Sequence, residues 1–136
     1  MNSFKIVVVD DEPKITNMLC RILREAGYSA YGAYEAEGAL MLCRHHAADM
    51  LISDVNMPAI TGIELAKQVC RELPRCHIVL LSRHSGTAAL LSQATASGSC
   101  LFPQLLRVFE LRRGLSYLVL FQKGAREGQC PLLRRD

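Results

Sequence analysis

The chain has 136 residues, of which 50% are hydrophobic and 21% charged, a composition typical of one compact globular domain. Its first ten residues lack the basic leader and cleavage-site pattern of an exported protein, and no apolar run reaches the ~20 residues of a membrane-spanning helix. We therefore expect a soluble, cytoplasmic protein. The net charge of +3 comes from the end of the chain: residues 1–100 hold nine Lys/Arg against ten Asp/Glu, and residues 101–136 hold seven against three.

Strands and helices are predicted to alternate from the start of the chain. Phe4 to Val9 (FKIVVV) is almost wholly apolar, which indicates a strand buried on both faces, as in a parallel sheet. After Pro13, apolar residues recur with the spacing of one helix face as far as Ala26, and Gly27 ends the helix. The segments that follow are a weaker strand over Tyr28 to Ala33, a helix over Glu35 to His46, a strand over Asp49 to Asp54, a helix over Ile63 to Leu73 before Pro74, and a strand over His77 to Ser82 (HIVLLS).

This alternation is typical of right-handed βαβ units, and it predicts an α/β fold with a doubly wound parallel sheet of five strands. The fifth strand is ambiguous. After a helix of small residues over Gly86 to Ser97, it is either Ser99 to Phe102, followed by a helix from Pro103 through Arg113, or Ser116 to Gln122 (SYLVLFQ), which has the better strand composition.

The six cysteines contain no C-x-x-C pair, and several stand among apolar residues of predicted elements. We therefore expect them to fill the core rather than to form disulfides or bind zinc.

Three carboxylates stand where predicted strands end. Asp10 and Asp11 follow the first strand, and Asp54 ends the third. Ligands of open α/β sheets bind outside the carboxyl ends of the strands, so these groups converge if the two strands are neighbours. Clustered carboxylates repel one another without a cation, and oxygen ligands suit Mg²⁺. Asn56 would add a backbone carbonyl, and Ser82 a hydroxyl, at the same rim.

Each of these residues also has a simpler interpretation. Asp10 and Asp11 would suit the positive end of a solvated helix N-terminus, and Ser82 would suit the cap of the next helix. His45 and His46, near the end of a predicted helix, are expected to be surface groups rather than metal ligands.

The chain carries three separate motifs in order: Val8-Val9-Asp10-Asp11-Glu12-Pro13, then Ile52-Ser53-Asp54-Val55-Asn56-Met57-Pro58 with Gly62 following, then Leu80-Leu81-Ser82. Together they resemble the receiver domain of bacterial two-component response regulators, over about residues 4–98.

The resemblance implies a flavodoxin-like fold that takes a phosphoryl group from a histidine kinase onto Asp54. It also implies that Asp11, Asp54 and the Asn56 carbonyl bind Mg²⁺, that Asp10 assists through water, and that the Ser82 hydroxyl closes on the phosphoryl oxygens. Such chemistry needs an aspartyl nucleophile and neutralised phosphoryl oxygens, and it makes a switch rather than a turnover enzyme.

One residue of the family pattern is missing. Receiver domains place a lysine at the carboxyl end of the fifth strand, and the expected stretch here, Leu101-Phe102-Pro103-Gln104, has none. Gln104 would donate hydrogen bonds but no charge. If residues 116–122 form the fifth strand, Lys123 follows it directly and would take the lysine's place.

We expect residues 1–105 to form the receiver-like domain and residues 106–136 a divergent C-terminal helix or tail, too short for a separate output domain. The expected partners are a sensor histidine kinase or phosphotransfer protein and a downstream effector protein, with a homodimer left open. Direct DNA binding is not expected, because the basic residues of the tail are interleaved with leucines and form no binding motif.

Three other functions remain as alternatives. A pseudo-receiver would be an interaction module that no longer responds to phosphorylation because the lysine is missing. A hydrolase with an aspartyl intermediate fits less well, because Asn56 cannot act as the general acid two residues after the nucleophile. A flavin or dinucleotide binder fits least, because no Gly-rich loop follows the first strand.

Overall fold

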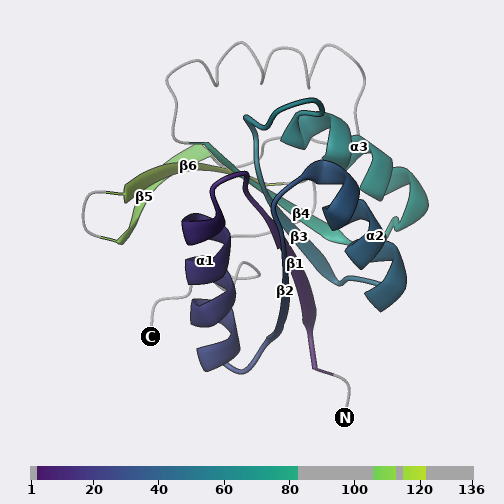
Figure 1. The fold of residues 1–136 in the computed structure, drawn as a ribbon, viewed down its shortest axis with the longest axis horizontal. Helices are drawn as coiled ribbons and strands as arrows, with labels where there is room; N and C mark the ends of the chain where they lie inside the picture. Colours follow the sequence, from purple (N-terminus) through teal and green to yellow (C-terminus); the bar gives the residue numbers. More distant parts are fainter. Residues whose placement is uncertain (1–2, 83–105, 113–114, 122–136) are drawn as a thin grey trace.

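A computed structural model describes residues 3–82, 106–112 and 115–121, which form a central sheet with helices on both faces (Figure 1). Within these residues, no helix has the length and apolar character that crossing a bilayer requires. The elements in chain order are β1 (Lys5–Val9), α1 (Pro13–Glu25), β2 (Ser29–Ala33), α2 (Ala36–His46), β3 (Met50–Asp54), α3 (Gly62–Glu72), β4 (His77–Ser82), β5 (Leu106–Arg112) and β6 (Leu115–Phe121).

The sheet confirms the predicted doubly wound architecture. Its strand order is β2-β1-β3-β4-β6-β5, and the first four strands are parallel. Helix α1 lies on one face, and α2 and α3 lie on the other (Figure 1). The strands at the centre, β1 and β3, are buried on both sides, which explains why their sequences are continuously apolar instead of alternating.

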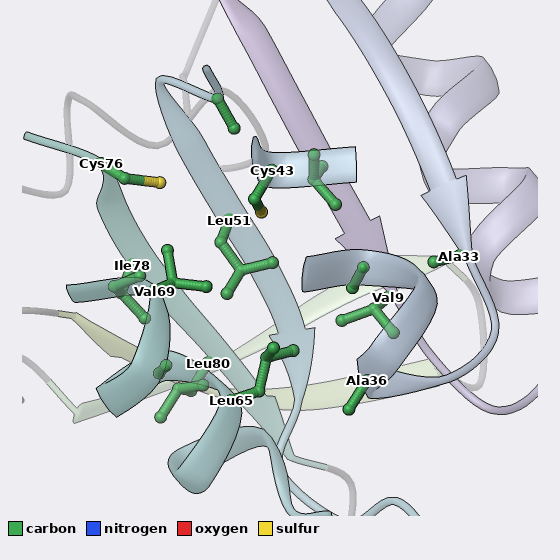
Figure 2. Close-up of a cluster of buried hydrophobic side chains, with 14 of the residues drawn as sticks. Val9, Ala33, Ala36, Cys43, Leu51, Leu65, Val69, Cys76, Ile78 and Leu80 are labelled. Atoms are coloured by element: carbon green, nitrogen blue, oxygen red, sulfur yellow. The ribbon is translucent and has the colours of Figure 1, made fainter. Parts of the chain in front are cut away.

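The two faces of the sheet carry separate hydrophobic clusters. Ile15, Leu19 and Leu23 follow one another at four-residue intervals along α1 and bury that helix against one face. The other cluster joins α2 and α3 to the sheet, and Figure 2 shows its side chains meeting between the helices and β3 and β4. Because the two clusters pack against both faces of β1 and β3, the carboxyl ends of these strands have fixed positions.

The cysteines of the described region belong to this core, as the sequence predicts. Cys20, Cys43, Cys70 and Cys76 are buried and free of disulfides. Figure 2 shows Cys43, on α2, and Cys76, just before β4, within the cluster that joins α2 and α3 to the sheet. Cys100 and Cys130 lie outside the described residues.

The end of the sheet differs from the prediction. The expected helix through Arg113 is wrong, because residues 106–112 form strand β5. A strand does occupy most of 116–122, as β6, but it runs antiparallel to β4 and to β5. The described sheet therefore has six strands and ends in an antiparallel hairpin, not in a fifth parallel strand.

The reason lies in the spacing of the two strands. Only residues 113 and 114 separate β5 from β6, a connection that can join antiparallel strands, whereas a parallel pair needs a crossover of a dozen or more residues. The predicted helix over 86–97 and the alternative strand over 99–102 lie outside the described residues. The division of the chain at residue 105 stays a prediction.

Candidate functional site

The fold brings the three predicted carboxylates together. Val9 of β1 pairs with Ser53 of β3, so the next residues along, Asp10 and Asp54, leave neighbouring strands at the same edge of the sheet. The ligand oxygens of Asp10, Asp11 and Asp54 all lie within 4.8 Å of one another. Among the described residues, this is the one group of three metal-ligating side chains so closely placed.

The members of this cluster, hereafter the acidic site, differ in exposure. Asp10 and Asp54 are 2% and 4% exposed, whereas Asp11 is open to solvent. Two ionised side chains at this depth are costly without compensation, and their closeness adds repulsion. A hard cation held by oxygen ligands offsets both costs, so the chemistry of the donor set fits Mg²⁺.

Backbone N–H groups orient the two buried carboxylates. The N–H of Glu12 donates to Asp10 Oδ1 at 2.9 Å, and the N–H of Asn56 donates to Asp54 Oδ1 at 3.3 Å. Asp10 also stands just before the first turn of α1, where the helix dipole favours negative charge. These interactions fix the carboxylates in place and leave the cluster facing the edge of the sheet.

Thr16 is a supporting residue that the sequence reasoning missed. Its fully buried hydroxyl lies 2.9 Å from the carbonyl of Asp10 and 3.3 Å from the carbonyl of Ala33, to which it can donate. The hydroxyl thus links α1 by hydrogen bonding to the ends of β1 and β2, beside the acidic site. A polar residue on the buried face of an amphipathic helix was the available signal, because a buried hydroxyl needs a partner.

Gly62 is a second supporting residue whose role the sequence did not reveal. A Cβ atom at this position would lie 2.0 Å from the carbonyl oxygen of Asp54 and 2.9 Å from Ser53 Oγ. The N–H of Gly62 donates to the Val55 carbonyl at 2.9 Å, and the N–H of Val55 donates to the Leu81 carbonyl at 2.9 Å. Only glycine allows α3 to begin this close to the end of β3, so this residue sets the backbone position of Asp54.

The other predicted site residues are placed less completely. Asn56 is partly buried next to Asp54, and the ligand role of its carbonyl stays a prediction. Ser82 is the last residue of β4, with Leu118 of β6 as its Cα partner; its side chain is not among the described ones. Gln104 and Lys123 lie outside the described residues.

The direction of β6 bears on the missing lysine. Phe121, the last residue of β6, pairs with Val79, whereas Leu118 pairs with Ser82. The strand therefore runs away from the sheet edge that carries Asp54. The expectation for Lys123 rested on a fifth parallel strand over 116–122, and β6 is not parallel to β4.

The two neighbouring histidines lie at the end of α2, in agreement with the surface role expected for them. The ring of His46 stacks on Tyr31, with centroids 3.7 Å apart and planes 12° apart, and His45 meets His46 edge-on. Burial against these neighbours lowers the pKa of His46, and the charges of His45 and Lys5 lower it further. Neither histidine belongs to the acidic site.

Comparison with known proteins agrees with this architecture. Residues 6–100 match the family described as the response regulator receiver domain. Over 86 residues, the chain is 33% identical to the response regulator GtcR of Aneurinibacillus migulanus; the match covers 63% of this chain and 36% of GtcR. This chain thus spans about a third of the length of that relative.

Solved structures give the same result. The chemotaxis protein CheY4 of Vibrio cholerae is 30% identical, with a TM-score of 0.63, over 72% of this chain and 82% of CheY4. The response regulator TrrA of Thermotoga maritima, solved in complex with Mg²⁺ and BeF, is 36% identical, with a TM-score of 0.59, over 66% of this chain and 79% of TrrA. Because the family match covers most of the chain and includes β1, β3 and β4 with the acidic site between them, the chain belongs to the response regulator receiver domains of two-component systems.

Proposed function

We propose that this receiver domain is a Mg²⁺-dependent phosphoacceptor switch and that Asp54 carries the phosphoryl group. The observation that supports this most is the convergence of Asp10, Asp11 and Asp54 within 4.8 Å at the carboxyl edge of the sheet. The resemblance to receiver domains assigns the nucleophile to Asp54, and the structure gives that residue a fixed carboxylate at the end of a buried strand.

In the proposed reaction, one oxygen of Asp54 forms a bond to the phosphorus of a phosphohistidine. The phosphorus–nitrogen bond breaks, and its electron pair returns to the imidazole of the kinase or phosphotransfer protein. The product is an aspartyl phosphate. Because phosphoryl transfer leaves little covalent chemistry to the protein, the contribution of this chain is to position the nucleophile and balance charge.

Asp11, Asp54 and the carbonyl of Asn56 would hold the metal ion, with Asp10 acting through a water molecule. Bound Mg²⁺ would supply positive charge to offset that of the transferring phosphoryl group. The burial of Asp10 and Asp54 beside each other supports this assignment, since such a pair is most stable when a cation lies next to it.

Phosphorylation then acts as a switch. A phosphoryl group adds about 1.5 to 2 negative charges, enough to rearrange neighbouring groups. We expect the hydroxyl of Ser82, at the end of β4, to close on the phosphoryl oxygens and so alter contacts with a downstream effector protein. Sustained hydrolysis is not expected, because Asn56 cannot act as a general acid two residues after the nucleophile.

A second candidate function is a pseudo-receiver that binds partners independently of phosphorylation. One observation favours it: β6, the sheet neighbour of β4, is antiparallel and ends away from Asp54. Residues 101–104 contain no lysine, and the strand before Lys123 is not parallel to β4, so the sequence offers no clear replacement for the lysine that receiver domains place beside the phosphoryl group.

Incubation with acetyl phosphate and Mg²⁺, followed by intact mass measurement, distinguishes the two functions. The phosphoacceptor gains the mass of one phosphoryl group, and both Asp54→Asn and removal of Mg²⁺ abolish the gain. Asp49→Asn is the matched control, because Asp49 precedes the same strand at its opposite end and accepts the N–H of Lys5. A folded wild-type chain that gains no mass at millimolar donor would support the pseudo-receiver instead.

A further inference from the structure

A hollow surface on the α2 side of the sheet is separate from the acidic site. It has a volume of about 640 Å³ and lies between the β2–α2 connection and the outer face of α2. Tyr34, Gly38, Met41 and His45 contribute to its lining, and it is hereafter the α2 groove. Two of its large apolar side chains face solvent, since Met41 is 62% exposed and Tyr34 is 48% exposed.

Polar side chains along α2 are arranged symmetrically about Met41, the most exposed of these residues. Glu37, Met41 and His45 are spaced at four-residue intervals, so they form one stripe along the helix, and all three are exposed. Glu37 stands in the first turn and His45 in the last. Arg44, the neighbouring cation, is already engaged, because its Nη2 lies 2.6 Å from Glu72 Oε1 on α3.

We propose that the α2 groove binds a second copy of this chain, with the two α2 helices antiparallel and a two-fold axis at Met41. In such an isologous dimer, if one residue of the first copy contacts a second residue of the other copy, the same contact occurs with the two copies exchanged. Glu37 of each copy lies level with His45 of the other, since both residues are four positions from the axis. The exposed Met41 of each copy packs at the centre, beside Gly38, whose lack of a side chain lets the helices approach.

Complementary hydrogen-bonding groups are what select a second copy as the occupant. An apolar hollow alone would accept many partners. The carboxylate of Glu37, an acceptor, and the imidazole N–H of His45, a donor, lie at equal distances from Met41, so they match their own image after a half-turn. The opposed helix dipoles of an antiparallel pair add to the attraction. This proposal does not depend on phosphorylation of Asp54.

The size of the surface predicts a weak association. Helix α2 has 11 residues, or about 16 Å of length, and one such helix with its flanking connection offers less than the ~800 Å² per partner of a stable interface. We expect a dissociation constant in the micromolar range or above, so the dimer forms only at high concentration.

Sedimentation velocity of the full chain, from about 5 to about 500 µM, tests the proposal. The wild-type chain should shift from monomer to dimer within this range, and Met41→Lys should raise the dissociation constant at least tenfold. Ile60→Lys is the matched control: Ile60 is also an exposed apolar residue, but it lies in the connection before α3, so this variant should dimerise like wild type.

A charge exchange tests the antiparallel register. Glu37→Arg and His45→Glu should each weaken the dimer, because the first removes the acceptor opposite His45 and the second places two carboxylates opposite one another. The double variant Glu37→Arg/His45→Glu should restore it. A wild-type monomer at every concentration, a dimer unaffected by Met41→Lys, or a double variant weaker than both single variants would each overturn the proposal. Far-UV circular dichroism confirms that every variant is folded.

Discussion

Replacing Gly62 with alanine tests whether the backbone at Asp54 is set by close packing against the start of α3. A methyl group at this position would meet the Asp54 carbonyl oxygen at 2.0 Å and Ser53 Oγ at 2.9 Å. The Asp54 oxygen is backbone, held within β3, and cannot rotate away as a flexible side chain would. The start of α3 must therefore move away from β3.

The magnitude follows from two opposing effects. Overpacking a buried contact costs about 1–3 kcal/mol, and a clash with backbone places Gly62→Ala at the upper end of that range. Helix propensity alone would favour alanine over glycine by about 0.5–1 kcal/mol. We expect a net loss of about 2 kcal/mol, together with slower phosphorylation of Asp54, because the displaced loop carries the carbonyl proposed to bind Mg²⁺.

Urea unfolding measures this change, with Gly38→Ala as the matched control. A Cβ at Gly38, within α2, would meet its nearest neighbours at 3.7 Å, an ordinary contact. The same substitution should therefore stabilise the protein by about 0.5–1 kcal/mol there. With a urea slope of about 1–3 kcal/mol per molar, the Gly62→Ala midpoint falls by roughly 1 M. A midpoint equal to or above wild type would refute the packing role.

Three further predictions concern the groups around the core and the site. Thr16→Val should lower the free energy of unfolding by about 1–2 kcal/mol, because the buried carbonyl of Asp10 loses the hydroxyl that donates to it at 2.9 Å. Without divalent ions, Asp11→Asn should raise the unfolding midpoint, because it relieves repulsion between the carboxylates. At a Mg²⁺ concentration a hundredfold above the dissociation constant, the wild-type protein should gain about 2.7 kcal/mol of stability, and Asp11→Asn should abolish this gain. Burial raises the pKa of the Cys43 and Cys76 thiols to about 12, so both thiols should resist alkylation at pH 8. The free energy of unfolding should fall as pH rises from about 9 towards 12, because in this range the thiols ionise in the unfolded chain but not in the folded one.

Each of these has a clear contrary result. Thr16→Val with wild-type stability would mean that the Asp10 carbonyl is satisfied without the hydroxyl. An Mg²⁺ response that survives Asp11→Asn would exclude that carboxylate as a ligand. Mass-mapped alkylation of Cys43 or Cys76 in the native protein, at the rate of the unfolded protein, would show that these thiols are accessible.

The parts of the fold that could be predicted from the sequence are those where one local pattern dominates. The apolar run before Asp10 identified a buried parallel strand, and the spacing of Ile15, Leu19 and Leu23 identified α1. Asp10, Asp11 and Asp54 were brought together by reasoning that parallel strands end at one edge, and the structure confirms their convergence.

The parts that could not be predicted depend on contacts between distant segments. Residues 106–112 have a composition compatible with helix or strand, and their pairing with β6 decides the outcome. The direction of β6 is likewise a tertiary property, so the sequence offered residues 116–122 only as one of two possible fifth strands and did not give their antiparallel orientation. Gly62 appeared only as the glycine that follows the Asp54 motif, because nothing local shows that the Asp54 carbonyl lies against it.

Paramagnetic line broadening by Mn²⁺ tests most directly whether the ends of β1 and β3 hold one ion. Mn²⁺ shares the oxygen-ligand preference of Mg²⁺, and substoichiometric amounts broaden amide resonances near the bound ion. The amides of residues 10–12 and 54–56 should broaden together in the wild-type protein, and excess Mg²⁺ should restore both sets. If only one of the two segments broadens, or neither does, the acidic site does not bind a shared ion and the proposed phosphoacceptor chemistry loses its basis.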